Sequence, residues 1–443
     1  MVAPPPGVGS DLLLQFYEGA VAAAAPGPAT TRAFEALNLD RSRRIWIFAI
    51  GKAARSMAAA AVAVARRSLH SIVGGIVVAP DDGPSPYSTI LSLRGDHPIP
   101  GRNSFEAAAR IAEIASGRRV TDVALVLLSG GATSLIGAPV LGIPEADFIA
   151  LHELLLRSGL DIAQMNAIRK RFARWSAGRL ALALAPGTTH CLAMSDVEGD
   201  DPAVIGSGPC VPDSTNVQEV MDILQRSNLL AHVPRSVREY LAAVVRRTIP
   251  ETPARSHPAF AHVVVRIIGN NTIARQGAAA TAQRHGFDAQ VVEDWLSGEA
   301  ARAGEAIARE LIARRARGDA GRCMVWGGEP TVTLTGTAAT SSGGGRCQEL
   351  ALAASRVLCQ AADGAAGIAV LAAGTDGRDG ATDAAGAIVD RATWPAIADA
   401  GVNPAHALAE HRSHAALRAA SALIARRDTG TNVNDVVIGT IAR

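Results

Sequence analysis

Lysine is scarce in this sequence. Of the 43 lysines and arginines in 443 residues, only Lys52 and Lys170 are lysines, which leaves 41 arginines. A drift from lysine to arginine on the surface accounts for this bias, and it spares a lysine where a planar guanidinium cannot replace a compact ammonium group. We therefore take both lysines as candidate functional residues, the alternative being that they survive by chance.

What else the chain lacks argues against several protein classes. The formal net charge is only +2 and the basic residues are scattered, so no nucleic-acid-binding surface is indicated. The five cysteines are odd in number and form no CxxC pair, which argues against a disulfide framework or a structural zinc site. The sequence shows neither a signal-peptide pattern nor an apolar run that would span a bilayer. We expect a cytoplasmic protein without membrane or nucleic-acid partners.

Apolar runs alternate with helical patterns rich in alanine, leucine and arginine. This alternation predicts βαβ units, and runs that are apolar throughout predict strands covered on both faces. The strands are expected at residues 45–50, 72–79, 123–129, 190–195, 262–268, 323–326, 368–373 and 435–441. The helices are expected at residues 53–69, 104–115, 165–185, 217–245, 272–285, 299–316 and 348–361.

The chain is long for one hydrophobic core, so two domains are expected. The segment 249–258 contains three prolines, has no apolar periodicity and is typical of a linker. We predict an α/β fold in two domains. The N-terminal domain, residues 1–250, has a Rossmann-like, mostly parallel sheet, and residues 251–443 form a smaller α/β domain.

Ligands of open α/β sheets bind beyond the carboxyl ends of the strands, and polar residues follow several predicted strands here. After the first strand, Gly51 and Lys52 open a helix, where backbone N–H groups and the helix dipole favour a phosphate or carboxylate. The sequence is not the GxxxxGK[ST] of a P-loop. The alternative is an ordinary helix start that carries a surface lysine.

Two further groups of residues are candidates for nucleotide contacts. Gly130, Gly131 and Ser134 follow a strand and suit close backbone approach to phosphate, although a plain tight turn explains them too. Asn166 and Lys170 share one face of a predicted helix, which points either to a ligand or to solvent.

Acidic residues follow the strand at 190–195. Asp196 and Asp200 stand where carboxylates hold Mg²⁺ together with substrate phosphates, or where one of them accepts a proton from a hydroxyl substrate. Ser207 follows between two glycines. The cluster is larger than a helix cap alone requires.

The C-terminal half repeats this pattern. Glu329 follows a pair of glycines, and Arg346 begins a helix after three glycines, which suits bidentate capture of a carboxylate or phosphate. Asp376 lies in a loop rich in glycine and aspartate, which we interpret as a metal-phosphate or substrate loop. His97 is either a substrate contact or a structural turn residue. The expected surface histidines are His406, His411 and His414.

Taken together, the candidate residues are poor in nucleophiles and rich in glycine, aspartate, lysine and arginine. Phosphoryl transfer needs this set, because its catalysis is mostly positioning and charge stabilisation. The residues alone therefore indicate a two-domain α/β phosphotransferase or another phosphate enzyme.

The motifs, in their order, resemble the class II glycerate kinases, which have an N-terminal glycerate-kinase domain and a C-terminal MOFRL domain. The matching strings are AIGKAARSM, RGDHPIPG, LSGGATSLIGAP, NAIRKRF, SDVEGDDPAVIGSGP, GGEPTVTLTG, GGGRCQELALA, GTDGRDGATDAAGAIVD and TGTNVND. The resemblance places the MOFRL region at about residues 322–440. It implies an active site in the cleft between the domains, with ATP and Mg²⁺ as cofactors, D-glycerate as acceptor and 2-phosphoglycerate as product. A homodimer is a further expectation.

The resemblance also implies residue roles. Lys52 and Arg346 would contact the anionic substrates. Our own hypothesis adds Asp196 as a catalytic residue, with Asp196 and Asp376 both candidates for the base or for Mg²⁺ binding. The residues expected on the nucleotide side are Gly130, Gly131, Ser134, Asn166, Lys170, Ser207, Glu329 and Asp376. The candidate Mg²⁺ ligands are Asp196, Asp200 and Asp376.

Three positions depart from the family pattern. Ala132-Thr133 stands where the family usually has Gly-Ser, Ser176-Ala177 where it commonly has Lys-Gly, and Cys347 where it usually has asparagine. Two other readings stay open. One is a hydroxypyruvate reductase, against which the lack of a GxGxxG after any predicted strand argues. The other is a non-catalytic sugar-acid-binding protein.

Overall fold

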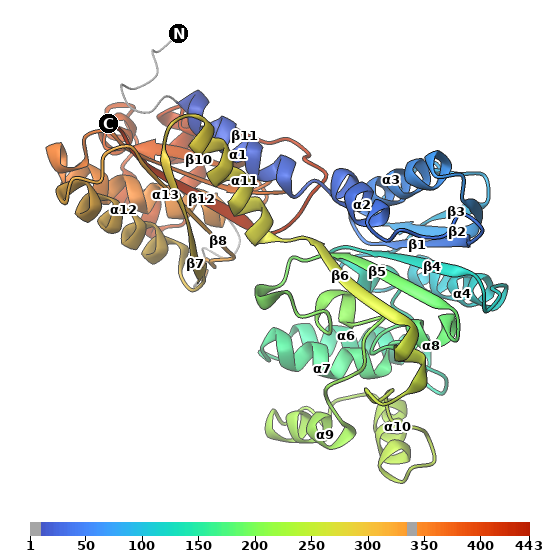
Figure 1. Ribbon diagram of the computed structural model, residues 1–443. Helices are drawn as coiled ribbons and strands as arrows, with labels where there is room; N and C mark the ends of the chain where they lie inside the picture. The colour runs from blue at the N-terminus through green and yellow to red at the C-terminus, as the bar shows by residue number, and fades with distance from the viewer. Residues whose placement is uncertain (1–9, 335–342) are drawn as a thin grey trace. The chain divides into compact units, whose positions relative to one another are not determined.

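The computed structural model describes residues 10–334 and 343–443. The chain forms two compact units, whose elements are labelled in Figure 1. The N-terminal unit is Pro26–Ile268, and the C-terminal unit combines Met1–Ala25 with Gly269–Arg443. No helix within the described ranges is both long and apolar enough to cross a membrane.

The N-terminal unit is built on a six-stranded sheet of order β3-β2-β1-β4-β5-β6. Its strands are β1 (Arg44–Ile50), β2 (Ser71–Ala79), β3 (Ile90–Arg94), β4 (Val123–Leu128), β5 (Thr188–Met194) and β6 (Val263–Gly269). The pairs β1–β2, β2–β3, β1–β4 and β4–β5 are all parallel. The predicted Rossmann-like sheet is therefore confirmed, and the carboxyl ends of β1, β4 and β5 lie side by side.

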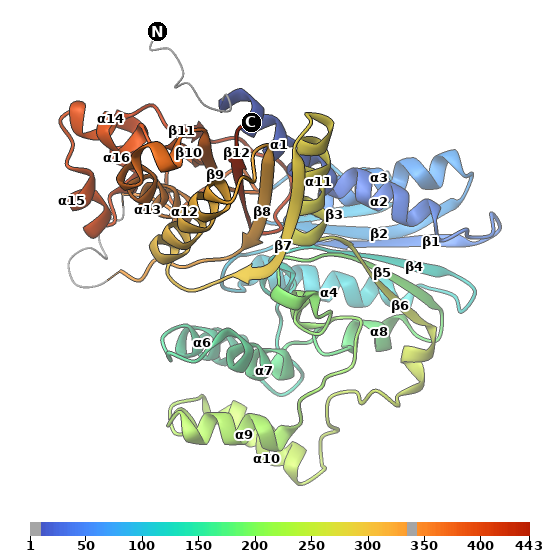
Figure 2. The same cartoon turned by 60° about the vertical axis from the view of Figure 1, so that its left-hand side comes forward.

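Helices cover both faces of this sheet. The helices are α2 (Pro26–Glu35), α3 (Ala54–Arg67), α4 (Arg102–Ser116), α5 (Ala132–Leu135), α6 (Glu145–Leu156), α7 (Ile162–Phe172), α8 (Arg179–Leu184), α9 (Val217–Arg226) and α10 (Arg235–Val245). Short 3₁₀ turns occur at Glu198–Asp200, Ile205–Ser207 and Pro258–His262. Figure 2 shows α2 and α3 on one face and α4 and α8 on the other. The helices α6, α7, α9 and α10 share a separate apolar cluster.

The C-terminal unit contains a mixed sheet of order β11-β10-β9-β12-β8-β7. Its strands are β7 (Asp288–Leu296), β8 (Arg322–Gly328), β9 (Ile368–Gly374), β10 (Ala384–Asp390), β11 (Leu423–Ala425) and β12 (Asp435–Ile441). Its helices are α1 (Ser10–Ala23), α11 (Asn271–Arg284), α12 (Ala300–Ala316), α13 (Arg346–Gln360), α14 (Thr393–Asp399), α15 (Pro404–Ala409) and α16 (Ser413–Ala419), with a 3₁₀ turn at Ala362–Ala365.

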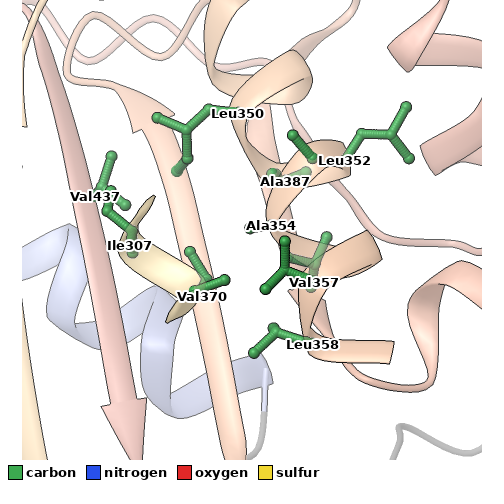
Figure 3. Close-up of a cluster of buried hydrophobic side chains, with 14 of the residues drawn as sticks. Ile307, Leu350, Leu352, Ala354, Val357, Leu358, Val370, Ala387 and Val437 are labelled. Atoms are coloured by element: carbon green, nitrogen blue, oxygen red, sulfur yellow. The ribbon is translucent and has the colours of Figure 1, made fainter. Parts of the chain in front are cut away.

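The core of this unit forms between α12, α13 and one face of the sheet. Figure 3 shows Leu350 and Val357 of α13 with Ile307 of α12 beside Val370 and Val437 of the strands. All five side chains are less than a tenth exposed. Because α13 is buried along most of its length, its first turn is held firmly over the sheet.

Three expectations need correction. The second sheet is mostly antiparallel, because β8, β12, β9 and β10 pair antiparallel and only β7–β8 is parallel. The helix expected at 165–185 is two helices, since Ala177 (φ 54°) and Gly178 (φ 78°) adopt left-handed conformations between them. The helix expected at 217–245 is likewise α9 and α10, which are separated by a turn before Pro234.

The division between the units also differs from the predicted boundary at residue 250. The segment 249–258 lies inside the N-terminal unit, because the following strand, β6, joins that unit's sheet. Helix α1 belongs to the C-terminal unit, where it packs closely on α11. A Cβ atom at Gly19 of α1 would lie 2.1 Å from Thr281 Oγ1, so glycine allows this close approach.

A glycine also sets the contact between α12 and α13. A Cβ atom at Gly304 would lie 2.0 Å from the carbonyl oxygen of Leu350, which belongs to a buried helix and cannot move freely. We expect Gly304→Ala to lower the free energy of unfolding by about 1–3 kcal/mol, as overpacking does. Chemical denaturation of the variant measures this change. Gly364→Ala is the control, since its Cβ would meet nothing closer than 3.9 Å; equal stability of the two variants would contradict the packing argument.

Candidate active site

The loops after β1 and β4 are locked together at the edge of the N-terminal sheet. The backbone N–H of Lys52 donates to the carbonyl of Gly130 at 2.9 Å, and the N–H of Ala53 donates to Ser129 Oγ at 3.0 Å. Gly51 has φ 129°, and a Cβ atom there would lie 2.1 Å from Ser129 Oγ. The glycine is therefore required by the close approach of the two loops, and it fixes the position of Lys52.

Three ionisable side chains surround the Gly130-Gly131 turn. A Cβ atom at Gly130 would lie 2.4 Å from Asp196 Oδ2. One at Gly131 would lie 3.1 Å from His97 Cδ2 and 3.7 Å from Lys52 Cε. Burial and the nearby charge of Lys52 lower the pKa of His97, which keeps the ring neutral near pH 7. The structure thus brings Lys52 and Asp196 together, as the sequence analysis expects, and adds His97.

Ser134 and Ser207, the two serines predicted to contact the nucleotide, form hydrogen bonds to neighbouring loops. Ser134 Oγ donates to the carbonyl of Pro98 at 2.6 Å, and Ser207 Oγ lies 2.9 Å from Thr133 Oγ1. Ser207 is buried. Both serines therefore shape the loops around the diglycine turn, and their contact with a nucleotide remains a prediction.

Lys170 is engaged in a buried ion pair. Its Nζ lies 2.7 Å from Asp213 Oδ1, and the side chains are 9% and 0% exposed. Burial raises the pKa of Asp213, but hydrogen bonds from Lys170 and Thr215 outweigh it, so the pKa is lowered. Asn166, one turn earlier on α7, is half-buried. Lys170, one of only two lysines in the chain, is therefore a residue held in place by the fold. A phosphate contact for Lys170 or Asn166 remains a prediction.

In the C-terminal unit, two carboxylates hold Arg346. Its Nε and Nη2 atoms lie 2.5 and 3.1 Å from the two carboxylate oxygens of Asp435, and Nη1 lies 3.0 Å from Glu329 Oε1. Burial raises the pKa of Asp435, and Arg346 opposes that shift. Burial lowers the pKa of Arg346, but Asp435 more than reverses this, so the guanidinium is permanently charged.

Arg346 lines a cavity of about 390 Å³ within this unit. The cavity is lined by Val332, Leu334, Gly344, Gly345, Arg346, Glu349, Asp376, Arg378, Asp379, Gly380 and His411. The predicted residues Arg346 and Asp376 therefore share one cavity. Its volume suits a small ligand.

Asp379 lines this cavity and contacts the first turn of α13. Its carboxylate accepts the N–H groups of Cys347 (3.0 Å) and Gln348 (2.8 Å), which caps the helix from another segment. Burial raises the pKa of Asp379, and these N–H donors oppose the shift. Two backbone N–H groups of this helix start, those of Cys347 and Gln348, are thus already occupied.

The C-terminal histidines differ from the expected surface residues. Only His406 is exposed, where its Nε2 lies 3.1 Å from Glu410 Oε1. His411 is half-buried, with Nδ1 2.8 Å from Oε1 of the buried Glu349. His414 places Nδ1 2.8 Å from Gln348 Oε1 and Nε2 3.0 Å from an oxygen of Asp383. Two of the three therefore pack against the start of α13.

No group of three His, Cys, Asp or Glu side chains that would hold a metal ion occurs in the part of the chain that the structure describes. Mg²⁺ keeps several waters and is bound by one or two carboxylates plus substrate phosphates. Two carboxylates could each hold Mg²⁺ together with waters and substrate phosphates: Asp196 beside Gly130, and Asp376 at the cavity. Asp200 ends the 3₁₀ turn after β5.

Two family profiles match the chain. A domain of unknown function (DUF4147) matches residues 12–242, and the MOFRL family matches residues 322–435. A D-glycerate 2-kinase of Thermotoga maritima is 33% identical over 433 residues, which cover 97% of this chain and 98% of that protein. The chain belongs to the glycerate kinase family.

A solved structure and a second relative are also similar to the chain over nearly its whole length. The crystal structure of a glycerate kinase from Thermotoga maritima has a TM-score of 0.86 and 32% identity, and covers 98% of this chain and 99% of that chain. A putative hydroxypyruvate reductase of Agrobacterium vitis is 35% identical over 430 residues, 96% of this chain and 93% of that protein. The resemblance seen in the motifs is therefore confirmed.

Four residues of these two sites were missed by sequence reasoning. Asp435 ends the string TGTNVND, so its position in a matching motif was a usable signal. Glu349 lies three residues after Arg346, in the first turn of the same helix. Asp213 and His411 had no such signal, because their partners Lys170 and Glu349 are distant in sequence.

The Lys170–Asp213 pair generates a stability prediction. Asp213→Asn would leave a buried ammonium without its carboxylate, so we expect the free energy of unfolding at pH 7 to fall by about 3–5 kcal/mol. The pKa of Asp213 is lowered in the folded protein. The pair therefore stabilises the fold above the ordinary aspartate pKa of about 3.9, and this contribution is lost as the pH falls toward the folded-state pKa.

Urea unfolding at a series of pH values measures both effects. The wild type should lose more stability than Asp213→Asn as the pH falls below about 4. A loss at pH 7 of less than about 1 kcal/mol, the range of exposed pairs, would show that the pair is not a structural constraint.

Proposed function

We propose that the protein is an ATP-dependent kinase that phosphorylates D-glycerate to 2-phosphoglycerate. The observation that carries the proposal is a permanently charged arginine at a small cavity, in a chain that aligns almost end to end with a D-glycerate 2-kinase. A carboxylate substrate and a nucleotide both need cationic partners. Each unit supplies one candidate: Lys52 comes from the N-terminal unit and Arg346 from the C-terminal unit.

In this proposal Lys52 and Arg346 bind the anionic groups of the substrates. Lys52 is exposed at the diglycine turn, where the backbone of Gly130 and Gly131 allows close approach of phosphate. Arg346 keeps N–H groups for a ligand after pairing with its two carboxylates, since a guanidinium has five. The remaining proposed nucleotide contacts are Ser134, Asn166, Lys170, Ser207, Glu329 and Asp376.

Mg²⁺ would be held by carboxylates among Asp196, Asp200 and Asp376, and it would neutralise charge on the transferred phosphoryl group. The protein's own part is to orient the acceptor hydroxyl and to exclude water. Asp196 stands as the proposed catalytic carboxylate of the N-terminal unit. A cytoplasmic location and a homodimer complete the proposal.

Lys52 provides a direct test of charge stabilisation. We expect Lys52→Ala to lower kcat/KM by about 10²–10³-fold, as loss of one stabilising donor does, while the exposed position leaves stability unchanged. Lys52→Arg should stay well below wild type, because a planar fork does not replace a compact ammonium group. Steady-state kinetics with a thermal unfolding control measure this. Near-wild-type turnover in Lys52→Ala would show that Lys52 takes no part in the reaction.

The reaction itself is tested by a coupled assay that follows ADP release with ATP, Mg²⁺ and D-glycerate, with the product fed to enolase. We expect signal through enolase directly, because enolase accepts 2-phosphoglycerate. A signal that requires added phosphoglycerate mutase would mean that the 3-hydroxyl is the acceptor. No ADP release, combined with tight D-glycerate binding, would instead support a non-catalytic sugar-acid-binding protein.

A reductase is the second candidate function. The observation that favours it is the 35% identity with a putative hydroxypyruvate reductase. The sequence has no GxGxxG after a strand, and this lack of a dinucleotide fingerprint argues against it. Oxidation of NADH in the presence of hydroxypyruvate, without ADP release from ATP and D-glycerate, would favour the reductase.

A further inference from the structure

The cavity of the C-terminal unit contains a histidine that is oriented by a buried carboxylate. His411 and Glu349 both line the cavity, and His411 Nδ1 lies 2.8 Å from Glu349 Oε1. Glu349 is 4% exposed and His411 is half-buried. A histidine that is oriented by a carboxylate acts as the base that activates a hydroxyl nucleophile on several unrelated folds.

The carboxylate determines which ring nitrogen is available. Burial raises the pKa of Glu349, and the hydrogen bond from His411 opposes that shift by favouring the carboxylate. A carboxylate oxygen accepts, so the Nδ1–H of His411 donates to Glu349, and in this tautomer the ring lone pair lies on Nε2. Nε2 has no protein partner among the described residues. His414, by contrast, has both ring nitrogens engaged, by Gln348 and Asp383.

The other acidic groups of the cavity are occupied. Asp379 accepts three N–H groups from Cys347 and Gln348. Asp376 Oδ1 accepts the backbone N–H of Arg378 at 3.0 Å, and this carboxylate is a proposed Mg²⁺ ligand. The Nε2 atom of His411 is therefore the proton acceptor that the geometry leaves available in the cavity that Arg346 also lines.

We propose that His411 is the general base that accepts the proton of the substrate hydroxyl, and that Glu349 is its positioning residue. This inference rests on the proposed kinase function. The hydroxyl proton passes to Nε2, and the oxygen forms a bond to the γ-phosphorus of ATP. The bond from that phosphorus to the β,γ-bridging oxygen breaks, ADP leaves with the electron pair, and the imidazolium returns its proton to solvent. The Glu349 carboxylate stabilises the imidazolium while it exists.

The test is chemical rescue. His411 has φ 55°, a left-handed conformation that glycine adopts readily, so His411→Gly fits the backbone and leaves space for free imidazole. We expect kcat to fall by about 10²–10⁴-fold, the KM for ATP to change little, and added imidazole to restore part of the lost kcat. Glu349→Gln should give a kcat between those of the wild type and His411→Gly.

His406→Ala is the matched control, because His406 also pairs with a glutamate but lies on the surface. It should keep wild-type kcat and show no response to imidazole. Asparagine tolerates the left-handed conformation, so His411→Asn is the second variant if His411→Gly does not fold, and it should show the same fall in kcat with an unchanged melting temperature.

The outcomes separate this inference from the proposed function. An active wild type together with near-wild-type kcat in His411→Gly or His411→Asn would overturn the role of His411 alone. The same holds for a loss of kcat in folded His411→Gly that imidazole does not restore. A wild type that releases no ADP from ATP and D-glycerate overturns the kinase function, and the inference with it.

Discussion

The C-terminal site depends on the buried carboxylate of Asp435. This residue begins β12, is 2% exposed, and would be costly to keep charged without a partner. Arg346 meets both of its oxygens, a two-point contact that a lysine ammonium cannot reproduce. Because Arg346 is the first residue of α13, the pair also fixes where that helix starts above the sheet. The pair acts together with the cap from Asp379 on the same turn.

The first turn of α13 shows how local sequence and distant segments combine. Gly345 precedes the helix and has no side chain with which to cap it. A Cβ atom there would lie 2.2 Å from Asp379 Cγ, so the glycine makes room for the carboxylate that caps the helix instead. Gln348 Nε2 donates to the same carboxylate at 2.8 Å, and Glu349 receives His411. The buried apolar residues that follow hold this turn in place, so the polar groups are ordered before any ligand arrives.

How much the sequence predicts depends on how local each feature is. The buried strands β1, β4 and β9 are largely apolar runs, and each is followed by a glycine-containing loop, where the sequence predicts the ligand sites. The strand β10 was missed because its sequence, AAGAIVD, has too few large apolar residues, and β7 because it is half exposed. The antiparallel pairing of β8, β12 and β9 has no signature in any single run, since all three are buried on both faces, as parallel strands usually are.

Long-range ion pairs mark the limit of the same reasoning. Arg346 was identified from its glycine-lined helix start, but its partner Asp435 is 89 residues away. Glu349 and His411 are 62 residues apart, and the histidine lies in a turn between two short helices with no motif around it. A single sequence therefore indicates which residues carry charge at strand ends. It does not indicate which buried carboxylate each of them meets, because that follows from the packing of whole elements.

The two lysines illustrate why a compositional signal needs a structure before it becomes a function. In an arginine-rich chain, a retained lysine marks a position where a compact ammonium group is required. Lys52 is exposed and follows Gly51, where a Cβ atom would clash. Lys170 is buried in an ion pair with Asp213, which also lies 3.6 Å from Arg171. The two lysines thus lie in different surroundings, one exposed at a proposed anion site and the other in a buried ion-pair network. Exposure sets the cost of an anion contact, because a buried ammonium must first give up its carboxylate partner, which destabilises the fold, whereas an exposed one binds an anion without breaking an ion pair.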